Sequence, residues 1–136
     1  MHKWNKGQDV KLGKYFSSYE FSCTCRYQSC VVQQVSKELI KKLDQVREKL
    51  GSPLIVTSGF RCSRKQADLR KAGHQTAVGK SSHEEGQAAD IAAIKSKELL
   101  KIVKEVFNNI GTAPTFLHVD VRPIKADGTK RLWVYA

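Results

Sequence analysis

Residues 81–90 decide how this chain is interpreted, and they read Ser81-Ser82-His83-Glu84-Glu85-Gly86-Gln87-Ala88-Ala89-Asp90. A helix would place His83 and Asp90 about two turns apart, too far for both to bind one metal ion. A loop that runs into a strand can bring them together, because Gly86 permits a bend and small alanines allow close packing. Imidazole nitrogen and carboxylate oxygen are ligands that zinc accepts. The stretch therefore predicts two metal ligands; a solvated histidine in a polar loop is the alternative.

A second group of polar residues lies on a predicted strand over residues 115–121. Side chains alternate along a strand, so one face presents Phe116, His118, Asp120 and Arg122, and the other turns Val119 and Val121 toward the core. His118 and Asp120 then lie ~6–7 Å apart along the chain. One of them can bind a metal while the other acts on a metal-bound water. A simple His–Asp surface pair is the alternative.

Joined together, His83, Asp90 and His118 make a set of two histidines and one aspartate. Three protein ligands leave the fourth tetrahedral position for water, which is the pattern of a catalytic rather than a structural zinc site. Zinc lowers the pKa of such a water toward ~7 and polarises a carbonyl group.

These residues also resemble a known family. The pattern Ser81-x-His83-x-x-Gly86-x-Ala88-x-Asp90 is similar to the signature of the zinc D-Ala-D-Ala metallopeptidases, which include D-Ala-D-Ala carboxypeptidases and dipeptidases and phage L-alanyl-D-glutamate endolysins. Further similar pieces follow in the same order, covering roughly residues 15–135: Phe16-Ser17-x-x-Glu20-Phe21-x-Cys23, Ser58-Gly59-Phe60-Arg61, Phe116-Leu117-His118-Val119-Asp120-Val121-Arg122-Pro123 and Trp133. The resemblance implies a fold shared with the hedgehog signalling domain.

The resemblance also implies roles for single residues. His83, Asp90 and His118 would bind one catalytic Zn²⁺. Arg61 would bind a substrate carboxylate or polarise its carbonyl, which suits a charged, bidentate guanidinium at a strand end; a solvated arginine is the alternative. Ser81 would contact substrate or orient the metal loop, and a serine that merely caps the loop is the alternative.

One departure from the family pattern concerns the general base. Many relatives carry an acid shortly before the second zinc histidine, but residues 108–117 contain none. Asp120 is the only carboxylate close to His118 in the sequence, so we assign it as the base. Glu84 and Glu85 are the fallback, although a solvated loop charge is the favoured explanation for each of them. Without a base in place, the domain would bind zinc without turnover.

The remaining pattern predicts a single α+β domain over residues 1–136, with a small, largely antiparallel sheet packed against helices. Residues 1–35 show little periodicity and are predicted to form an irregular segment packed on the domain. Apolar spacing and caps predict helices over 36–50, 63–70 and 96–110, with Ser36, Ser63 and Ser96 as N-caps. Strands are predicted over 54–57, 88–92, 115–121 and 131–135.

The chain has 136 residues and a formal net charge of +11. Such a charge draws a protein to polyanions, which include cell-envelope polymers and nucleic acid; no nucleic-acid-binding motif accompanies it. Its apolar runs are far shorter than the ~20 residues of a membrane-spanning helix. The N-terminus is polar and lacks the apolar stretch of a secretory signal. We therefore expect a monomer made in the cytoplasm that reaches the cell wall after release.

Four cysteines stand at positions 23, 25, 30 and 62. Free thiols, a structural zinc site and one or two disulfides all remain open. The C-x-C spacing is tighter than the usual C-x2-C of zinc sites, so the spacing indicates zinc only weakly.

The function favoured by these observations is zinc-dependent hydrolysis of peptidoglycan stem or cross-link peptides that contain D-amino acids, by a phage-type endolysin. The sequence leaves open whether the enzyme is a carboxypeptidase or an endopeptidase, a choice that residues 64–80 and the N-terminal segment would set. The alternative is a non-enzymatic, zinc-stabilised binding module of hedgehog-like fold.

Overall fold

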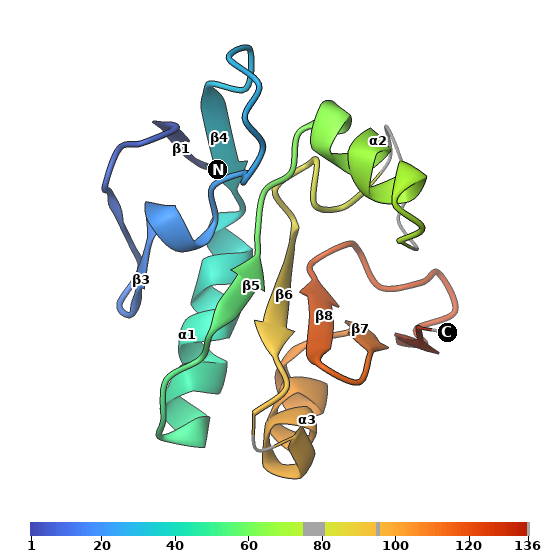
Figure 1. The fold of residues 1–136 in the computed structure, drawn as a ribbon. Coiled ribbons are helices and arrows are strands. Elements are labelled where there is room, and N and C mark those ends of the chain that lie inside the picture. The colour runs from blue at the N-terminus through green and yellow to red at the C-terminus, as the bar shows by residue number, and fades with distance from the viewer. Residues whose placement is uncertain (75–80, 95, 136) are drawn as a thin grey trace.

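The computed structural model describes residues 1–74, 81–94 and 96–135, and Figure 1 shows their arrangement. The α-helices in these ranges are α1 (Lys37–Leu50), α2 (Ser63–Lys71) and α3 (Ser96–Val106), and a 3-10 turn, η1, spans Ser18–Glu20. The strands are β1 (His2–Asn5), β2 (Lys11–Leu12), β3 (Phe16–Ser17), β4 (Val32–Val35), β5 (Val56–Ser58), β6 (Ala88–Ala92), β7 (Asn109–Thr112), β8 (Phe116–Asp120) and β9 (Arg131–Val134).

The central sheet has the strand order β5-β6-β8-β7-β9. Neighbouring strands are antiparallel, except that β7 and β9 run parallel. This confirms the predicted α+β class with a small, largely antiparallel sheet. Strand β6 contains Asp90, the last residue of the 81–90 stretch, and pairs with β8, which contains His118, so strand pairing brings the two ligand segments together.

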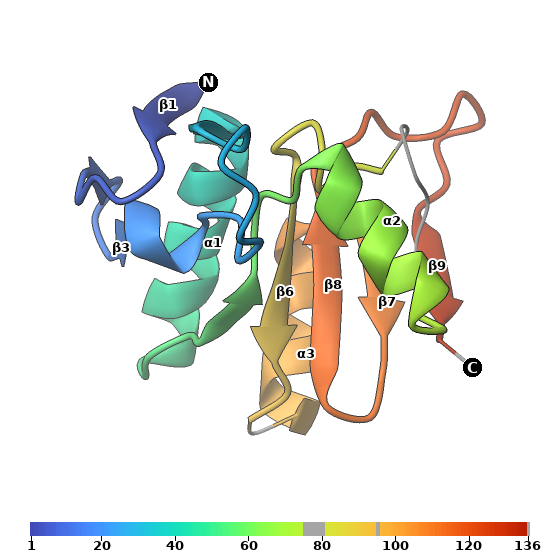
Figure 2. The same ribbon diagram turned by 45° about the horizontal axis from the view of Figure 1, so that its top comes forward.

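The two faces of the sheet have different neighbours. Figure 2 shows α1 and α3 side by side on one face and α2 over the other. The layer beneath α1 and α3 holds the buried hydrophobic core, which includes Leu39, Leu43, Ile91, Val103 and Val119. Burying an aliphatic side chain contributes about 1.5–3 kcal/mol, so this layer stabilises the fold. The face beneath α2 is left to carry polar groups.

Helix α1 forms where the sequence predicts it. Ser36 is its N-cap, and the Ser36 side chain accepts a hydrogen bond from the backbone N–H of Leu39. Gly51 ends it in the left-handed conformation, with a φ of 72°, which only glycine adopts without cost. None of the described helices is long and apolar enough to span a membrane.

Helix α3 is shorter than predicted, because it ends at Val106 and the chain then enters β7. The predicted helix ran to Ile110 since Phe107 and Ile110 continue the apolar spacing. Both are buried in the core, but Phe107 lies just after α3 and Ile110 lies within β7. Two asparagines, Asn108 and Asn109, separate them, and asparagine is a poor helix former. The expected cap at Ser96 falls outside the described side chains.

Other boundaries differ by a residue or two. Helix α2 begins at Ser63, but its N-cap is Cys62, whose sulfur accepts from the backbone N–H of Lys65. The prediction that Ser63 caps this helix was therefore wrong. Strand β5 starts two residues later than predicted, after Leu54, which contributes to the core without joining the sheet.

The N-terminal segment is more ordered than predicted. Strand β1 pairs with β4, and β2 pairs with β3, both antiparallel. Aromatic side chains anchor it: the Phe16 and Phe21 rings meet edge-to-face at 5.7 Å, and Trp4 Nε1 donates to Ser22 Oγ at 2.8 Å. Strands of two to four residues are too short for alternation to show in the sequence, which explains the difference.

Candidate metal centre

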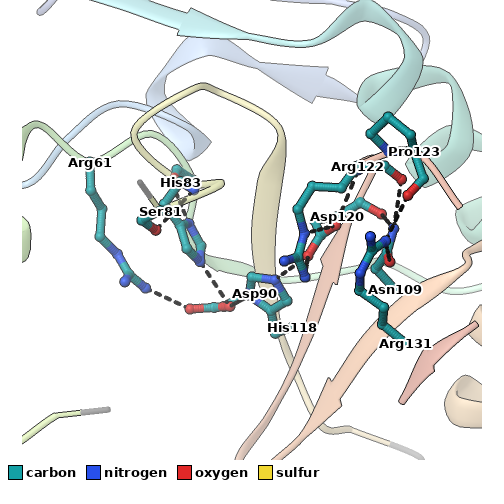
Figure 3. Close-up of polar contacts among 11 residues, drawn as sticks. Arg61, Ser81, His83, Asp90, Asn109, His118, Asp120, Arg122, Pro123 and Arg131 are labelled. Atoms are coloured by element: carbon teal, nitrogen blue, oxygen red, sulfur yellow. Dashed lines mark hydrogen bonds and ion pairs between the residues drawn. The ribbon is translucent and has the colours of Figure 1, made fainter. Parts of the chain in front are cut away.

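Most residues of the site lie opposite one another on neighbouring strands, in one row across the sheet. Asp90 pairs with Ser58 of β5 on one side and with His118 of β8 on the other. His118 in turn lies opposite Gly111 of β7, which lies opposite Trp133 of β9. Side chains of directly paired residues share a face of the sheet. Strand pairing thus joins Asp90 and His118, which stand 28 residues apart (Figure 3).

His83 reaches the same point from the loop before β6. Gly86 allows this loop to turn, with a φ of 73°, and a Cβ at that position would lie 2.7 Å from the backbone oxygen of Gln34. The Nδ1 atom of His83 lies 2.7 Å from the carbonyl oxygen of Gly59. A carbonyl only accepts, so Nδ1 carries the proton and Nε2 presents a lone pair toward Asp90.

The three side chains converge on one small volume. His83 Nε2 and His118 Nδ1 lie 3.3 Å and 3.2 Å from the same oxygen of Asp90, Oδ1. One ligand atom from each residue lies within 4.8 Å of the others, and all three residues are buried. The lone pair of His83 thus faces a carboxylate oxygen, and a cation between them would relieve the repulsion. Two imidazole nitrogens and one carboxylate oxygen are the donors of many catalytic zinc sites, so the residues fit Zn²⁺.

The charge states of His83 and Asp90 suit metal binding, whereas His118 must give up a proton before it can bind a metal. Burial lowers the pKa of His83, and the neighbouring positive charges of Arg61 and His118 lower it further, so its imidazole is neutral. Burial also disfavours charge on His118, but hydrogen bonds with Asp120 and Asp90 outweigh it and raise the pKa of His118. Burial opposes ionisation of Asp90, yet hydrogen bonds with both histidines keep its pKa below the ordinary value. An ionised carboxylate and a neutral imidazole are the forms that ligate metals.

Arg61 holds the second oxygen of Asp90. Its Nη2 lies 2.7 Å from Oδ2 of Asp90, while its Nε donates to Ser58 Oγ at 2.8 Å and its Nη1 donates to Gln66 Oε1 at 3.0 Å. These contacts involve three of the five N–H groups of a guanidinium. Arg61 also lines a cavity that it shares with His83, Asp90 and His118. It can therefore orient a metal ligand and donate to a bound group at once.

Asp120 lies behind His118, away from the other ligands. Its Oδ2 is 2.8 Å from His118 Nε2, and Arg122 donates from Nε to Oδ1 and from Nη2 to Oδ2, both at 2.9 Å. The Asp120 side chain is fully buried. The carboxylate keeps the proton of His118 on Nε2 and leaves Nδ1 for a metal. This geometry favours a role for Asp120 in orienting the ligand.

A cavity of about 710 Å³ lies over the three ligands. Lys65 and Leu69 of α2 contribute one side, and the sheet contributes aromatic side chains. Three cationic residues line it, namely Arg61, Lys65 and Arg122. Among its described lining residues Asp90 is the only carboxylate, so the cavity favours negatively charged groups.

The aromatic side of this cavity depends on Gly111. A Cβ at Gly111 would lie 2.5 Å from Nε1 of Trp133 and 2.7 Å from the ring of Tyr135. With no side chain there, Trp133 lies over the sheet, its ring 5.3 Å from that of His118. The guanidinium of Arg122 lies 5.7 Å from the Trp133 ring. Trp133 thus links the metal ligands to the cavity wall.

Comparison with known families shows the class to which this arrangement belongs. Residues 14–120 match Peptidase M15. The chain belongs to the peptidase M15 family. A search among curated proteins gives no match. The predicted relationship to the zinc D-Ala-D-Ala metallopeptidases is thereby confirmed. M15 peptidases are zinc-dependent, which agrees with the donor set of His83, Asp90 and His118, and the chain is a metallopeptidase.

Of the remaining residues predicted for the site of this M15 peptidase, Ser81 lines the cavity, whereas Glu84 and Glu85 do not. Ser81 lies in the cavity lining and its Oγ accepts from the backbone N–H of His83 at 3.2 Å, so it shapes the metal loop. Glu84 accepts a hydrogen bond from Ser63 Oγ at 3.0 Å, and Glu85 is exposed. Neither glutamate is among the described residues that line the cavity. Residues 75–80 of the predicted specificity loop lie outside the described residues.

Several site residues escaped sequence reasoning. Gln66, which supports Arg61, is a buried polar residue on a basic helix, and nothing in the spacing marks it. Tyr135 lines the cavity and shares a strand face with Trp133, so alternation along the strand was a usable signal for it. Burial raises the pKa of Tyr135, which therefore remains a phenol and a hydrogen-bond donor at neutral pH.

Proposed function

We propose that this M15 peptidase hydrolyses peptidoglycan stem or cross-link peptides that contain D-amino acids. The observation that carries the proposal is the convergence of His83, Asp90 and His118 beneath a cavity lined by cationic side chains. Stem peptides carry free carboxylates, which arginine and lysine side chains recognise by charge and hydrogen bonding. The resemblance of the metal motifs to those of D-Ala-D-Ala peptidases supports the same substrate class.

The residues of the cavity have complementary tasks in this reaction. His83, Asp90 and His118 would hold a Zn²⁺, which when bound would acidify a water and polarise the scissile carbonyl. Arg61 fixes Asp90 and donates to the substrate carbonyl or carboxylate, a contact worth about 3–4 kcal/mol if it strengthens in the transition state. Tyr135 also lines the cavity and supplies a second donor. Arg122 and Lys65 attract the carboxylates of the peptide.

The role of Asp120 is proposed from its contacts. Asp120 orients His118 and sets its tautomer, in place of the base role assigned from sequence position. The two roles predict different behaviour of an Asp120→Asn variant.

The biological setting proposed for this activity is that of a phage-type endolysin acting on the wall of its host. The net charge of +11 supports it, because a cationic enzyme is attracted to the anionic polymers of a cell envelope.

The test is mass spectrometry of purified peptidoglycan digested by the protein, with EDTA and after Zn²⁺ is restored. We expect products that disappear with EDTA and return with Zn²⁺. Loss of a terminal D-alanine would identify a carboxypeptidase, and release of stem peptides an endopeptidase. His118→Ala should abolish the products, whereas His2→Gln, in β1 and outside the site, should not. Bound Zn²⁺ without products from any wall type would instead indicate a binding module.

A further inference from the structure

The four cysteines form a second cluster of metal-binding side chains, separate from the histidine site. One sulfur from each of Cys23, Cys25, Cys30 and Cys62 lies within 4.8 Å of the others. None of the four forms a disulfide in the structure. We propose that this cluster binds a second Zn²⁺, a structural ion that fastens the N-terminal segment to the wall of the peptidase cavity.

The spacing of the sulfurs matches a single tetrahedral ion. Four thiolates at ~2.3 Å around one Zn²⁺ have their sulfurs ~3.8 Å apart. The Cys62 sulfur lies 3.8 Å from that of Cys23 and 3.6 Å from that of Cys25. A disulfide would need ~2.05 Å. An iron–sulfur cluster would spread the sulfurs around several iron atoms. One ion coordinated by all four sulfurs accounts for these distances.

Each sulfur also accepts a hydrogen bond from a nitrogen, as thiolate ligands do. The backbone N–H of Cys62 donates to Cys23, and the backbone N–H of Lys65 donates to Cys62, both at 3.4 Å. Gln33 Nε2 donates to Cys30 at 3.4 Å, and Lys6 Nζ donates to Cys25 at 3.3 Å. These four donors stabilise negative charge on sulfur. The ammonium of Lys6 and the N-terminus of α2 further offset the charge of a four-thiolate site.

The place of the cluster in the fold gives the ion a structural task. Cys23 and Cys30 are buried, and four protein ligands would leave no open position for a substrate. Cys62 directly follows Arg61, and Thr24, between two of the cysteines, lines the cavity. The ion would therefore join segments far apart in the chain at the point where they form the cavity wall.

The cysteine site can be tested with the histidine site removed. In a His83→Ala/His118→Ala variant, elemental analysis should find one Zn²⁺ per chain, against two in the unmodified protein. Replacing that zinc with Co²⁺ should give the intense sulfur-to-cobalt charge-transfer absorption of a tetrahedral thiolate site. X-ray absorption at the zinc edge should show a shell of sulfur alone. This variant keeps all four cysteines, so the test does not depend on a cysteine variant that folds.

A complementary variant separates the ligands from their surroundings. Cys25→Ser/Cys30→Ser should retain one Zn²⁺ per chain, whereas Ser29→Ala, beside a ligand but not one of them, should retain two. In the unmodified protein, Zn²⁺ should protect all four thiols from alkylation, and EDTA should expose them. The proposal is overturned if the histidine-site variant binds no Zn²⁺, if alkylation is the same with and without Zn²⁺, or if the native mass reveals disulfides. These outcomes leave the proposed peptidase activity standing.

Discussion

Among single residues, Asp120 is the one whose contacts fix the orientation of a metal ligand, His118. Both of its oxygens are engaged, by His118 on one side and Arg122 on the other, and its side chain is fully buried. A group so placed can hold an imidazole in one orientation but has no contact with the cavity over the ligands. Its effect on catalysis should therefore pass through the metal.

We predict that Asp120→Asn weakens Zn²⁺ binding at neutral pH by about 10–100-fold, the usual cost of losing such an outer-shell partner. The pH dependence of zinc uptake should also change. The carboxylate raises the pKa of His118, so in the unmodified protein protons compete with the metal as pH falls through that raised pKa. Without the charge, the pKa of His118 falls and competition begins at lower pH. Competitive titration with a chromophoric chelator across pH measures both effects.

The same variant decides between the two roles of Asp120. If Asp120 orients His118, saturating Zn²⁺ should restore most of the cleavage rate. If it is the general base, zinc would stay bound at the unmodified affinity while cleavage is lost. Asp127→Asn, at an exposed turn, is the matched control and should change neither quantity.

A chain of side chains at the end of β8 keeps Asp120 in place. Arg131 Nη1 donates to Asn109 Oδ1 at 2.8 Å, and Asn109 Nδ2 donates to the carbonyl oxygen of Arg122 at 2.9 Å (Figure 3). Arg131 also donates to the carbonyl of Pro123 at 2.6 Å. Residues of β7 and β9 thus fix the backbone that follows Asp120, which explains how one buried carboxylate keeps a single orientation.

At the scale of elements, the register of the paired strands from β5 to β9 brings the residues of the site together. Asp90, His118 and Trp133 come from the strands β6, β8 and β9. Gly111 of β7 lies between His118 and Trp133 and has no side chain. A one-residue slip of any strand would turn its ligand to the core face. The packing of Ile91 and Val119 in the core therefore also maintains the geometry of the metal centre.

The aromatic wall of the cavity, formed by Trp133 and Tyr135, lies over Gly111. The substitution Gly111→Ala tests how far this wall depends on the absence of a side chain there. The added Cβ would press on Trp133 and Tyr135 at 2.5–2.7 Å, so the two rings must shift from their positions. We predict a loss of about 1–3 kcal/mol in the free energy of unfolding, as for other overpacked sites, a changed tryptophan emission spectrum and a lower kcat/KM. Urea unfolding, fluorescence and peptide kinetics measure these three quantities.

The control for this substitution lies on the neighbouring strand, β9. Leu132 is more than half exposed on the opposite face of β9, so Leu132→Ala should change stability by less than ~0.5 kcal/mol. Unfolding and kinetics of Gly111→Ala that match those of the unmodified protein would show that the wall does not depend on this glycine.

Sequence reasoning succeeded where the signal is local. Neighbouring residues alone predict the caps of α1 and the bounds of β6. They also predict the bend at Gly86 that follows His83. It failed at α3, where apolar spacing ran across a helix and the next strand without a break. It also missed Gln66 as the partner of Arg61, because no periodicity marks a buried polar residue on a basic helix. The cysteine cluster is intermediate, since only the fold brings Cys62 to the other three.

At the scale of the whole molecule, the N-terminal segment and the peptidase cavity are built as one unit. Gly59 passes so close to Phe21 that a Cβ would lie 2.6 Å from the Phe21 Cα, and the backbone N–H of Phe60 donates to the carbonyl of Phe21. The loop that carries His83 is joined to the start of α1, because the N–H of Ser36 donates to the carbonyl of Gly86 at 2.7 Å. The proposed cysteine site adds a third junction at Cys62.

This arrangement predicts where the protein loosens when only the cysteine site loses its metal. In the His83→Ala/His118→Ala variant, EDTA should increase hydrogen–deuterium exchange in residues 22–35 and 59–66, which surround the cysteines and Arg61. Residues 39–46 and 99–103, in the core between α1 and α3, should keep their protection, because their burial does not involve the ion. Equal loosening of all four segments would instead mean that the ion supports the whole fold. Unchanged exchange would mean that the contacts of Phe21 and Ser36 hold the N-terminal segment without the ion, and that the cavity wall does not depend on metal bound by the cysteines.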